Sequence, residues 1–352
     1  YNVFLGVNPG AQFGRPNNAP VCDGATVDFL ITPDLTNVPG TTYTVYYGDG
    51  SSAVFTHPPP ATVSHTYTSS SCTGGPYTVT CGGSQFPVVP ASNTFTACLC
   101  VENPCGGFPP TAPNIIVHEA ANAGFNAPTT ACTTNGVPFT STSTGGVIGA
   151  PCGTPYHTWS INGPGAYNLQ AGNLGPFGST GLTVQFPVPG VYTVSLTAEG
   201  EICPADTYDQ QICIEPPLVP TFDTTQVGLC NPVTLNLQNT TDLTDNCSVQ
   251  WDWVVSGSGF CGATAAWQWT NGGATSASPT IQFTAPGTYT VRLRAFNSCG
   301  WQQSAPVTVT VFDDPVIQLG GALSLCEGDG ANPAATYTTC GTPILTYLWS
   351  MP

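Results

Sequence analysis

Cysteine is the residue type with the widest chemistry in this sequence, which holds 16 cysteines among 352 residues. A cysteine can ligate zinc, act as a nucleophile or pair in a disulfide. Zinc sites need paired cysteines with further cysteine or histidine ligands close by, and the tightest group, Cys98, Cys100 and Cys105, does not have that spacing. In a chain that is also rich in Thr, Gly and Pro, the cysteines predict disulfides and an oxidising compartment.

The other reactive residues do not form a catalytic motif. The histidines, His57, His65, His118 and His157, have no metal-ligand spacing. The sequence has no Gly-x-Ser-x-Gly elbow, phosphate-binding loop or dinucleotide fingerprint, and it has no lysine for Schiff-base chemistry. We therefore predict that the protein is not an enzyme.

Charge is scarce and one-sided. There are 19 acidic residues against three basic ones, which gives a formal net charge of −16 at pH 7. Nucleic acid and anionic membrane surfaces should repel such a chain. No apolar stretch approaches the ~18 residues of a membrane-spanning helix. We therefore predict neither nucleic-acid binding nor membrane insertion.

The elements that must position the cysteines repeat along the chain with a period near 97 residues. Three landmarks recur in order: a cysteine before a strand (Cys132, Cys230 and Cys326), a tryptophan in a short aromatic strand (Trp159, Trp253 and Trp349), and a Gln-Phe block that runs through Pro-Gly-x-Tyr-Thr-Val (residues 184–194 and 281–291). Repeats of about 100 residues with short alternating strands are typical of β-sandwich domains. We predict that these three tryptophans, Tyr192 and Tyr289 anchor the cores.

The fold class follows from this repeat and from the 40 Gly and 35 Pro, which argue against long helices. We predict an all-β fold of tandem immunoglobulin-like antiparallel β-sandwich domains in an extended array, with short Pro-rich linkers as semi-rigid spacers. The predicted domains are 1–104 (a divergent copy), 105–216, 217–314 and 315–352 (the start of a fourth). Because the sequence lacks an initiator Met and stops within a predicted strand, we expect it to be an excerpt of a longer mature polypeptide.

The cysteines divide evenly among these domains when Cys105 is counted with the first domain as part of its linker, and this division predicts that each domain pairs its own. In three domains the first two cysteines precede the tryptophan strand and are predicted to pair, and elimination pairs the remaining two of the second and third domains, whereas Cys72–Cys81 is a separate prediction for the first domain. The predicted bonds are Cys132–Cys152, Cys230–Cys247, Cys326–Cys340, Cys203–Cys213, Cys261–Cys299 and Cys72–Cys81. The pairing of Cys22, Cys98, Cys100 and Cys105 stays open.

Three motifs carry a resemblance to a known family: the Tyr-Gly-Asp-Gly turn at residues 47–50, the strand around Trp253, and the Pro-Gly-x-Tyr-Thr-Val blocks. In these motifs the chain resembles the PKD-like repeats of giant surface proteins of Bacteroidota that are exported by the type 9 pathway. Only the first repeat keeps Gly-Asp-Gly after its aromatic strand. The resemblance implies PKD-like sandwiches of an adhesin, or of a fibre that forms surface filaments or hooks.

A few residues are candidates for ligand binding. Asp49, Asp313 and Asp314 are candidate calcium ligands, but calcium needs six to eight oxygens, and the sequence favours a turn residue at Asp49 and a solvated linker at Asp313 and Asp314. No other cofactor is expected. Trp267 and Trp269 would point the same way from a strand, either as a glycan-binding platform or as core and junction residues.

The predicted function is a structural repeat segment of an extracellular, cell-surface filament or adhesin, in which disulfides staple a stiff rod. Exposed sheet edges are usually protected by lysine, which is absent here, so we expect copies to assemble into a homo-oligomeric fibre. The expected partners are neighbouring domains of the same longer chain, other copies, and a cell-surface or glycan target. The alternative is a set of glycan-binding modules of a secreted enzyme. The sequence does not identify the target or the number of subunits.

Overall fold

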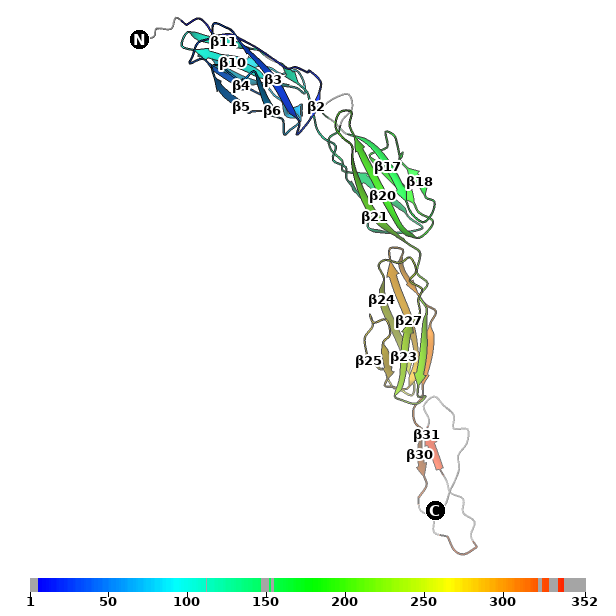
Figure 1. Ribbon diagram of the computed structural model, residues 1–352. Helices are drawn as coiled ribbons and strands as arrows, with labels where there is room; N and C mark the ends of the chain where they lie inside the picture. The colour runs from blue at the N-terminus through cyan, green and yellow to red at the C-terminus, as the bar shows by residue number, and fades with distance from the viewer. Residues whose placement is uncertain are drawn as a thin grey trace.

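The computed structural model describes residues 6–111, 113–146, 152, 155–321, 325–328 and 335–338. Trp349 and Cys340, two of the predicted site residues, lie outside these ranges. Figure 1 shows three β-sandwiches that follow one another end to end in an extended, gently curved array. Apart from one 3₁₀ turn, Ser71–Thr73, every regular element in the described part is a strand. The predicted all-β tandem array is therefore confirmed.

The second sandwich consists of two four-stranded sheets that face each other. One sheet has the order β14-β16-β19-β18, with bounds Phe125–Asn126, Gly136–Ser141, Gly181–Gln185 and Asn168–Ala171. The other has the order β15-β21-β20-β17, with bounds Thr130–Cys132, Asp206–Glu215, Gly190–Glu199 and Tyr156–Asn162. All pairings are antiparallel except β15 with β21, which is parallel.

The third sandwich repeats this plan. Its first sheet has the order β22-β23-β26-β25, with bounds Phe222–Val227, Val233–Asn239, Thr280–Phe283 and Trp267–Asn271. Its second sheet contains β24 (Gln250–Gly259), β27 (Gly287–Asn297), β28 (Gly300–Gln303) and β29 (Val307–Val311), and both of the last two pair with β27. Beyond it, β30 (Val316–Leu319) pairs with β31 (Ala335–Thr338).

The first sandwich is a larger variant. One sheet contains β1 (Ala11–Gly14), β3 (Thr26–Pro33) and β6 (Thr62–Thr66), and the other contains β11 (Gly106–Thr111), β10 (Cys98–Asn103), β4 (Thr42–Tyr46) and β5 (Ser52–Thr56). An added hairpin, β7 (Tyr77–Cys81) with β8 (Ser84–Val88), has its own small core. Two short pairs complete it: β12 (Asn114–Ile115) with β9 (Phe95–Thr96), and β13 (Val117–His118) with β2 (Val21–Cys22). Because β11, β12 and β13 pair with strands of the first sandwich, this unit reaches past the predicted boundary at residue 104.

The repeated motifs form the cores of the second and third sandwiches. Side chains alternate between buried and partly exposed along β20 and β27, because successive residues of a strand point to opposite faces. Trp159 and Trp253 lie in the cores, where each indole nitrogen donates to a backbone carbonyl. Tyr192 and Tyr289 are fully buried, and each hydroxyl donates to the carbonyl four residues earlier, at 2.9 and 2.8 Å. The Pro-Gly-x-Tyr block therefore makes a corner that the tyrosine hydroxyl closes.

Candidate functional site at the junctions between sandwiches

The structure joins most of the paired cysteines across domain junctions. Cys22–Cys203 and Cys72–Cys152 connect the first and second sandwiches. Cys132–Cys299 and Cys213–Cys247 connect the second and third. Cys81–Cys100 lies within the first sandwich, where it ties the added hairpin to β10.

The predicted pairing within domains is therefore wrong. The contradicted bonds are Cys72–Cys81, Cys132–Cys152, Cys203–Cys213, Cys230–Cys247 and Cys261–Cys299. Cys261 is disulfide-bonded, but Cys299 is not its partner because Cys299 bonds Cys132. Cys230 is a free thiol, whereas the prediction for Cys326 involves Cys340, which lies outside the described residues.

The reason for this error is the length of a strand. Cys132 and Cys152 stand on either side of β16, whose six residues span roughly 20 Å. A disulfide requires Cα atoms within about 7 Å. The two cysteines therefore belong to opposite ends of the sandwich, and each meets a neighbouring domain instead. The same argument separates Cys203 from Cys213 along β21.

Both junctions have the same local geometry around one of their two disulfides. A cysteine in a short strand pairs in parallel with the last residue of its own sandwich, and the partner sulfur from the next sandwich approaches the carbonyl of that last residue. In the first junction Cys22 pairs with His118, and the Cys203 sulfur lies 3.7 Å from the His118 carbonyl oxygen. In the second, Cys132 pairs with Glu215, and the Cys299 sulfur lies 3.3 Å from the Glu215 carbonyl oxygen.

The second junction also contains a fully buried carboxylate, that of Glu215. One carboxylate oxygen accepts hydrogen bonds from the backbone N–H groups of Cys247 and Ser248, each at 2.8 Å, and the other accepts one from the N–H of Ser298 at 2.8 Å. Burial alone would raise the pKa of Glu215, but the hydrogen bonds from Ser298, Ser248 and Cys247 outweigh burial and lower the pKa below its ordinary value. The end of the second sandwich is thereby held by two loops of the third.

Asn297, which is also buried, adds to this contact. Its side-chain amide donates to the carbonyl of Pro216 in the linker at 2.8 Å and to the side-chain oxygen of Asn246 at 2.7 Å. Its own side-chain oxygen accepts from the N–H of Cys299 at 2.9 Å. The hairpin that carries Cys299 is therefore fixed against the linker as well as bonded to the second sandwich.

At the first junction, hydrogen bonds fix the segment that leaves the first sandwich. The carboxylate of Asp23 accepts a hydrogen bond from the N–H of Ala120 at 3.0 Å, and the N–H of Asp23 donates to the carbonyl of His118 at 2.8 Å. The N–H of Val117 donates to the hydroxyl of Ser71 at 3.1 Å. The segment that leaves the first sandwich is thus paired to that sandwich rather than free.

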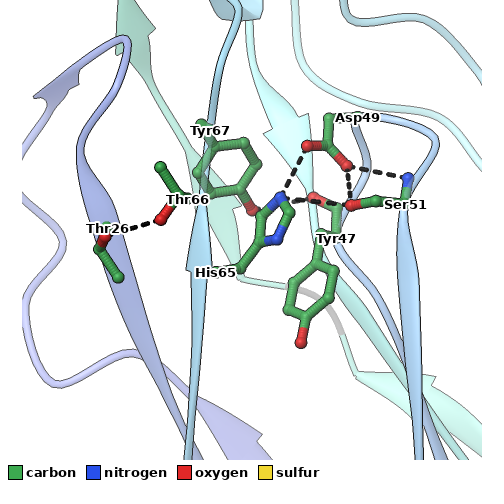
Figure 2. Close-up of polar contacts among 7 residues, drawn as sticks. All are labelled: Thr26, Tyr47, Asp49, Ser51, His65, Thr66 and Tyr67. Carbon is green, nitrogen blue, oxygen red and sulfur yellow. Dashed lines mark hydrogen bonds and ion pairs between the residues drawn. The ribbon is translucent and has the colours of Figure 1, made fainter.

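Asp49, a candidate calcium ligand, takes part in a polar cluster that bridges the two sheets of the first sandwich (Figure 2). Its two carboxylate oxygens are used by different partners: one accepts from the N–H and the hydroxyl of Ser51, and the other contacts Nε2 of His65 at 2.7 Å. The His65 ring stacks on Tyr47 with centroids 4.0 Å apart and meets Tyr67 edge-on. Both oxygens of the Asp49 carboxylate are therefore engaged by protein groups, which agrees with a structural role in the turn.

This Ser-His-Asp cluster does not have the geometry of a catalytic triad. In a triad the carboxylate holds Nδ1 of the histidine and the serine hydroxyl faces Nε2. Here the same Nε2 atom contacts both Asp49 and the hydroxyl of Ser51, which is 3.2 Å away. The arrangement therefore joins a turn to β6 and does not activate the serine.

We expect Asp49→Asn to destabilise the first sandwich by about 1–3 kcal/mol at pH 7, because hydrogen bonds to an ionised group are lost. Burial would raise the pKa of Asp49, but the hydrogen bonds from Ser51 and His65 lower it overall. A lowered pKa in the folded state gives stability that is present above the unfolded pKa and lost as pH falls through the folded pKa. Hydrogen exchange of β5 and β6 at pH 7 and pH 3 measures both effects.

The matched control is Asp28→Asn on β3, where an exposed carboxylate accepts one hydrogen bond from the hydroxyl of Ser64. It should change the exchange rates little. Equal effects of the two substitutions would contradict the role given to Asp49.

The other candidate calcium ligands, Asp313 and Asp314, are exposed residues after β29. Within the described ranges the one group of three close potential ligands is Cys81, Cys100 and Glu102, and its two sulfurs are bonded to each other. In the part that it describes, the structure therefore does not place Asp49, Asp313 or Asp314 in a group of three or more close potential ligands.

The two candidate glycan-binding tryptophans lie on β25, an edge strand. Trp269 packs against the core of the third sandwich, and the ring of Trp267, which is 38% exposed, meets Tyr289 edge-on with centroids 6.2 Å apart. Both indoles thus contact residues of the core. They do not present a pair of flat exposed rings.

The hydrogen bonds by which Glu215 and Asn297 hold the second junction were not predicted from the sequence. A signal for the junctions was present, because Cys203 and Cys299 are spaced 96 residues apart and Cys152 and Cys247 are spaced 95 apart. These regular spacings follow the repeat, and they indicate that both pairs occupy equivalent places in successive domains.

Comparison with known proteins gives similarity of fold only. No family model matches the chain, and no curated protein matches it. Among solved structures, the Escherichia coli adhesin FdeC aligns over 88% of this chain and 99% of its own at 13% identity and a TM-score of 0.36. Invasin, a bacterial integrin-binding protein, aligns over 89% of this chain and 63% of its own at 10% identity and a TM-score of 0.29. Immunoglobulin domains 1–5 of Sidekick-1 align over 88% of this chain and 60% of their own at 13% identity and a TM-score of 0.29.

The sheet order and the corners decide the fold. The chain is a tandem array of immunoglobulin-like sandwiches. At such identities and TM-scores, the solved structures say nothing about what this chain binds. Among its described residues there is no helix with the length and apolar character needed to cross a bilayer.

Proposed function

We propose that this chain is a segment of a stiff extracellular rod, a structural part of a cell-surface filament or adhesin. The observation that carries the proposal is the pair of disulfides at each of the two junctions. Structural disulfides persist in oxidising environments, which supports an extracellular location. An enzyme or a freely hinged binding module has no need of such junctions.

The mechanical argument starts from the linkers. A single peptide linker leaves two domains free to rotate, so relative motion is the default between domains that share a small interface. Here each junction has three covalent connections, namely the linker and two disulfides that start from separate loops of the following sandwich. At the second junction, Glu215 and Asn297 add hydrogen bonds that bending would break. Each junction should therefore resist bending in every direction.

The finer assignment, to PKD-like repeats of a Bacteroidota surface protein exported by the type 9 pathway, rests on the sequence motifs alone and stays a prediction. The same holds for assembly of copies into a fibre. The absence of lysine and the low density of charge favour assembly, since little charge repulsion opposes side-by-side packing.

Removal of the disulfides at one junction is expected to turn the rod into two segments joined by a hinge. The variant replaces Cys132, Cys299, Cys213 and Cys247 by serine. Electron micrographs of single particles should then show a broad distribution of angles at the second junction, against a narrow distribution in the unaltered protein.

The matched control replaces Cys81 and Cys100 by serine, which removes a disulfide inside the first sandwich and leaves both junctions intact. This control should keep the narrow distribution of angles. A rod that stays equally straight without the four junction cysteines, or an unaltered protein that already bends freely, would disprove the mechanical role. Light scattering at rising concentration tests the fibre separately.

A further inference from the structure

Two free cysteines occupy the same repeat positions as cysteines that join neighbouring sandwiches. Within the three sandwiches, the strand-start cysteines are Cys22, Cys132 and Cys230, and the hairpin cysteines are Cys105, Cys203 and Cys299. One disulfide at each junction joins the strand-start cysteine of one sandwich to the hairpin cysteine of the next. In this series Cys105 and Cys230 are the two members that lack a partner within the described residues.

We propose that Cys105 and Cys230 each form a disulfide with an adjoining sandwich domain of the same type. Cys105 bonds the strand-start cysteine of a preceding domain, and Cys230 bonds the hairpin cysteine of a following domain. The inference rests on the proposed function as a rod segment and adds the chemistry by which that rod is continued at both ends.

The surroundings of Cys230 reproduce those of the two bonded strand-start cysteines. Cys230 forms a parallel bridge with Phe312, and the following N–H, of Asn231, donates to the carbonyl of Phe312 at 2.7 Å. Around Cys132, the N–H of Thr133 donates to the carbonyl of Glu215 at 3.0 Å. Around Cys22 the equivalent bond runs from the N–H of Asp23 to the carbonyl of His118 at 2.8 Å.

The carbonyls of His118, Glu215 and Phe312 mark the position at which the sulfur of the next sandwich's hairpin cysteine lies or would lie. His118, Glu215 and Phe312 are spaced 97 residues apart in both steps. At the first two, the hairpin cysteine of the next sandwich approaches the carbonyl oxygen, at 3.7 and 3.3 Å. The position beside Phe312 is therefore built in the same way, and a hairpin cysteine of a following sandwich would complete it.

The surroundings of Cys105 match those of the bonded hairpin cysteine Cys299. The N–H of Cys105 donates to the side-chain oxygen of Asn103 at 2.8 Å, as the N–H of Cys299 does to Asn297 at 2.9 Å. The side-chain amide of Asn103 donates to the carbonyl of Val7 at 2.9 Å, as that of Asn297 does to the carbonyl of Pro216 at 2.8 Å.

This correspondence places Gly6 where Glu215 stands in the second junction, since each residue precedes the carbonyl that the asparagine binds. A Cβ atom added to Gly6 would come 2.7 Å from the Cys105 sulfur. The Cys299 sulfur lies beside Glu215 in the same manner. Cys105, which is exposed, is thus held at the entry of the first sandwich in the orientation that a bonded hairpin cysteine adopts.

A role for Cys230 as a nucleophile or a metal ligand is disfavoured by its acidic neighbours. Burial, together with the hydrogen bond that the thiol donates to the Asp314 carboxylate and the negative charges of Asp314 and Asp313, raises the pKa of the Cys230 thiol. A raised pKa reduces the thiolate that nucleophiles and metal ligands require. A structural disulfide does not depend on that thiolate once it has formed.

Formation of each new bond converts two thiols into one disulfide and releases two protons and two electrons. The electrons pass to a disulfide-carrying oxidant, the same class of co-reactant that must form the four junction bonds already described. The partner domain belongs to the same polypeptide rather than to a second copy. For Cys230 this follows from β30, which begins at Val316, only a few residues after β29 ends at Val311, so a further β unit of the same chain directly follows the third sandwich.

The test is a disulfide map of the protein isolated from the organism that makes it. Free thiols are blocked with N-ethylmaleimide in denaturant without reductant, and the protein is cut with pepsin at low pH to prevent exchange of disulfides. Mass spectrometry should find nearly all of Cys105 and Cys230 in disulfide-linked peptides, each joined to a cysteine peptide outside residues 1–352. Cys98, a buried free cysteine that belongs to neither set, is the control and should carry the maleimide.

Maleimide on Cys105 or Cys230 would overturn the proposal. A cross-link between Cys105 and Cys230 would also overturn it, because that bond joins two copies. Micrographs of the same preparation separate this failure from failure of the rod itself: straight particles with unpaired Cys105 and Cys230 would leave the proposed function standing.

Discussion

Trp253→Ala is expected to destabilise the third sandwich by about 3–5 kcal/mol, the range for loss of a large aromatic side chain from a core. The indole is 3% exposed and meets Phe222 edge-on with ring centroids 5.0 Å apart. Its nitrogen donates to the carbonyl of Ser276 at 2.7 Å, so the substitution also leaves that carbonyl unpaired. Hydrogen exchange of β24 and β27 should rise by several orders of magnitude while the first sandwich keeps its protection.

Trp301→Ala on β28 is the matched control, since this indole is 50% exposed and contacts Phe296 and Arg294 at the surface. It should cost less than about 1 kcal/mol, the value of a surface cation–π contact. If both substitutions had the same effect, the tryptophan of the repeat would not be the anchor of the core.

Glu215→Ala is expected to weaken the second junction by at least about 3 kcal/mol, because three backbone N–H groups lose their acceptor and each costs about 1–3 kcal/mol when buried without one. The N–H groups of Cys247, Ser248 and Ser298 should exchange much faster, and the Cys132–Cys299 disulfide should become easier to reduce. Glu199→Ala, at the exposed end of β20, is the control and should leave these rates unchanged.

The same carboxylate gives the junction a dependence on pH. Although burial acts to raise it, the pKa of Glu215 is lowered by the hydrogen bonds it accepts. The stabilisation is therefore present above the unfolded pKa of about 4.3 and is lost as pH falls through the lower folded pKa. Exchange at the junction should accelerate in strong acid in the unaltered protein. In Glu215→Gln, whose side chain carries no charge, hydrogen exchange at the junction should already be fast at pH 7. If the exchange rates of this variant depended on pH as those of the unaltered protein do, the role of the charge would be refuted.

Much of the fold was predictable because its signals are local. Alternation along residues 190–199 and 287–297 indicates strands with one buried face, and a Pro-Gly before the tyrosine indicates a corner. The burial of Trp159 and Trp253 follows from their size and from the repeat. The first sandwich extends past its predicted end, since β13 pairs with β2, a strand far earlier in the chain, and no local pattern marks that pairing.

The candidate site was harder to predict, since its residues act in pairs from different domains. An even number of cysteines in a domain is compatible with bonds inside it and with bonds that enter and leave it. Glu215 resembles any acidic residue of a linker until its neighbours are known. The fact that its carboxylate meets Ser298, 83 residues away, depends on how two domains abut.

By itself, the sequence determined the class of each unit, its length and the side chains that fill its core, because these depend on alternation and on a repeat of about 97 residues. The tertiary structure alone decided which sulfurs meet. A strand of six residues carries neighbouring cysteines to opposite ends of a sandwich, far beyond the reach of a disulfide, and only the stacking of one sandwich on the next brings each to its partner.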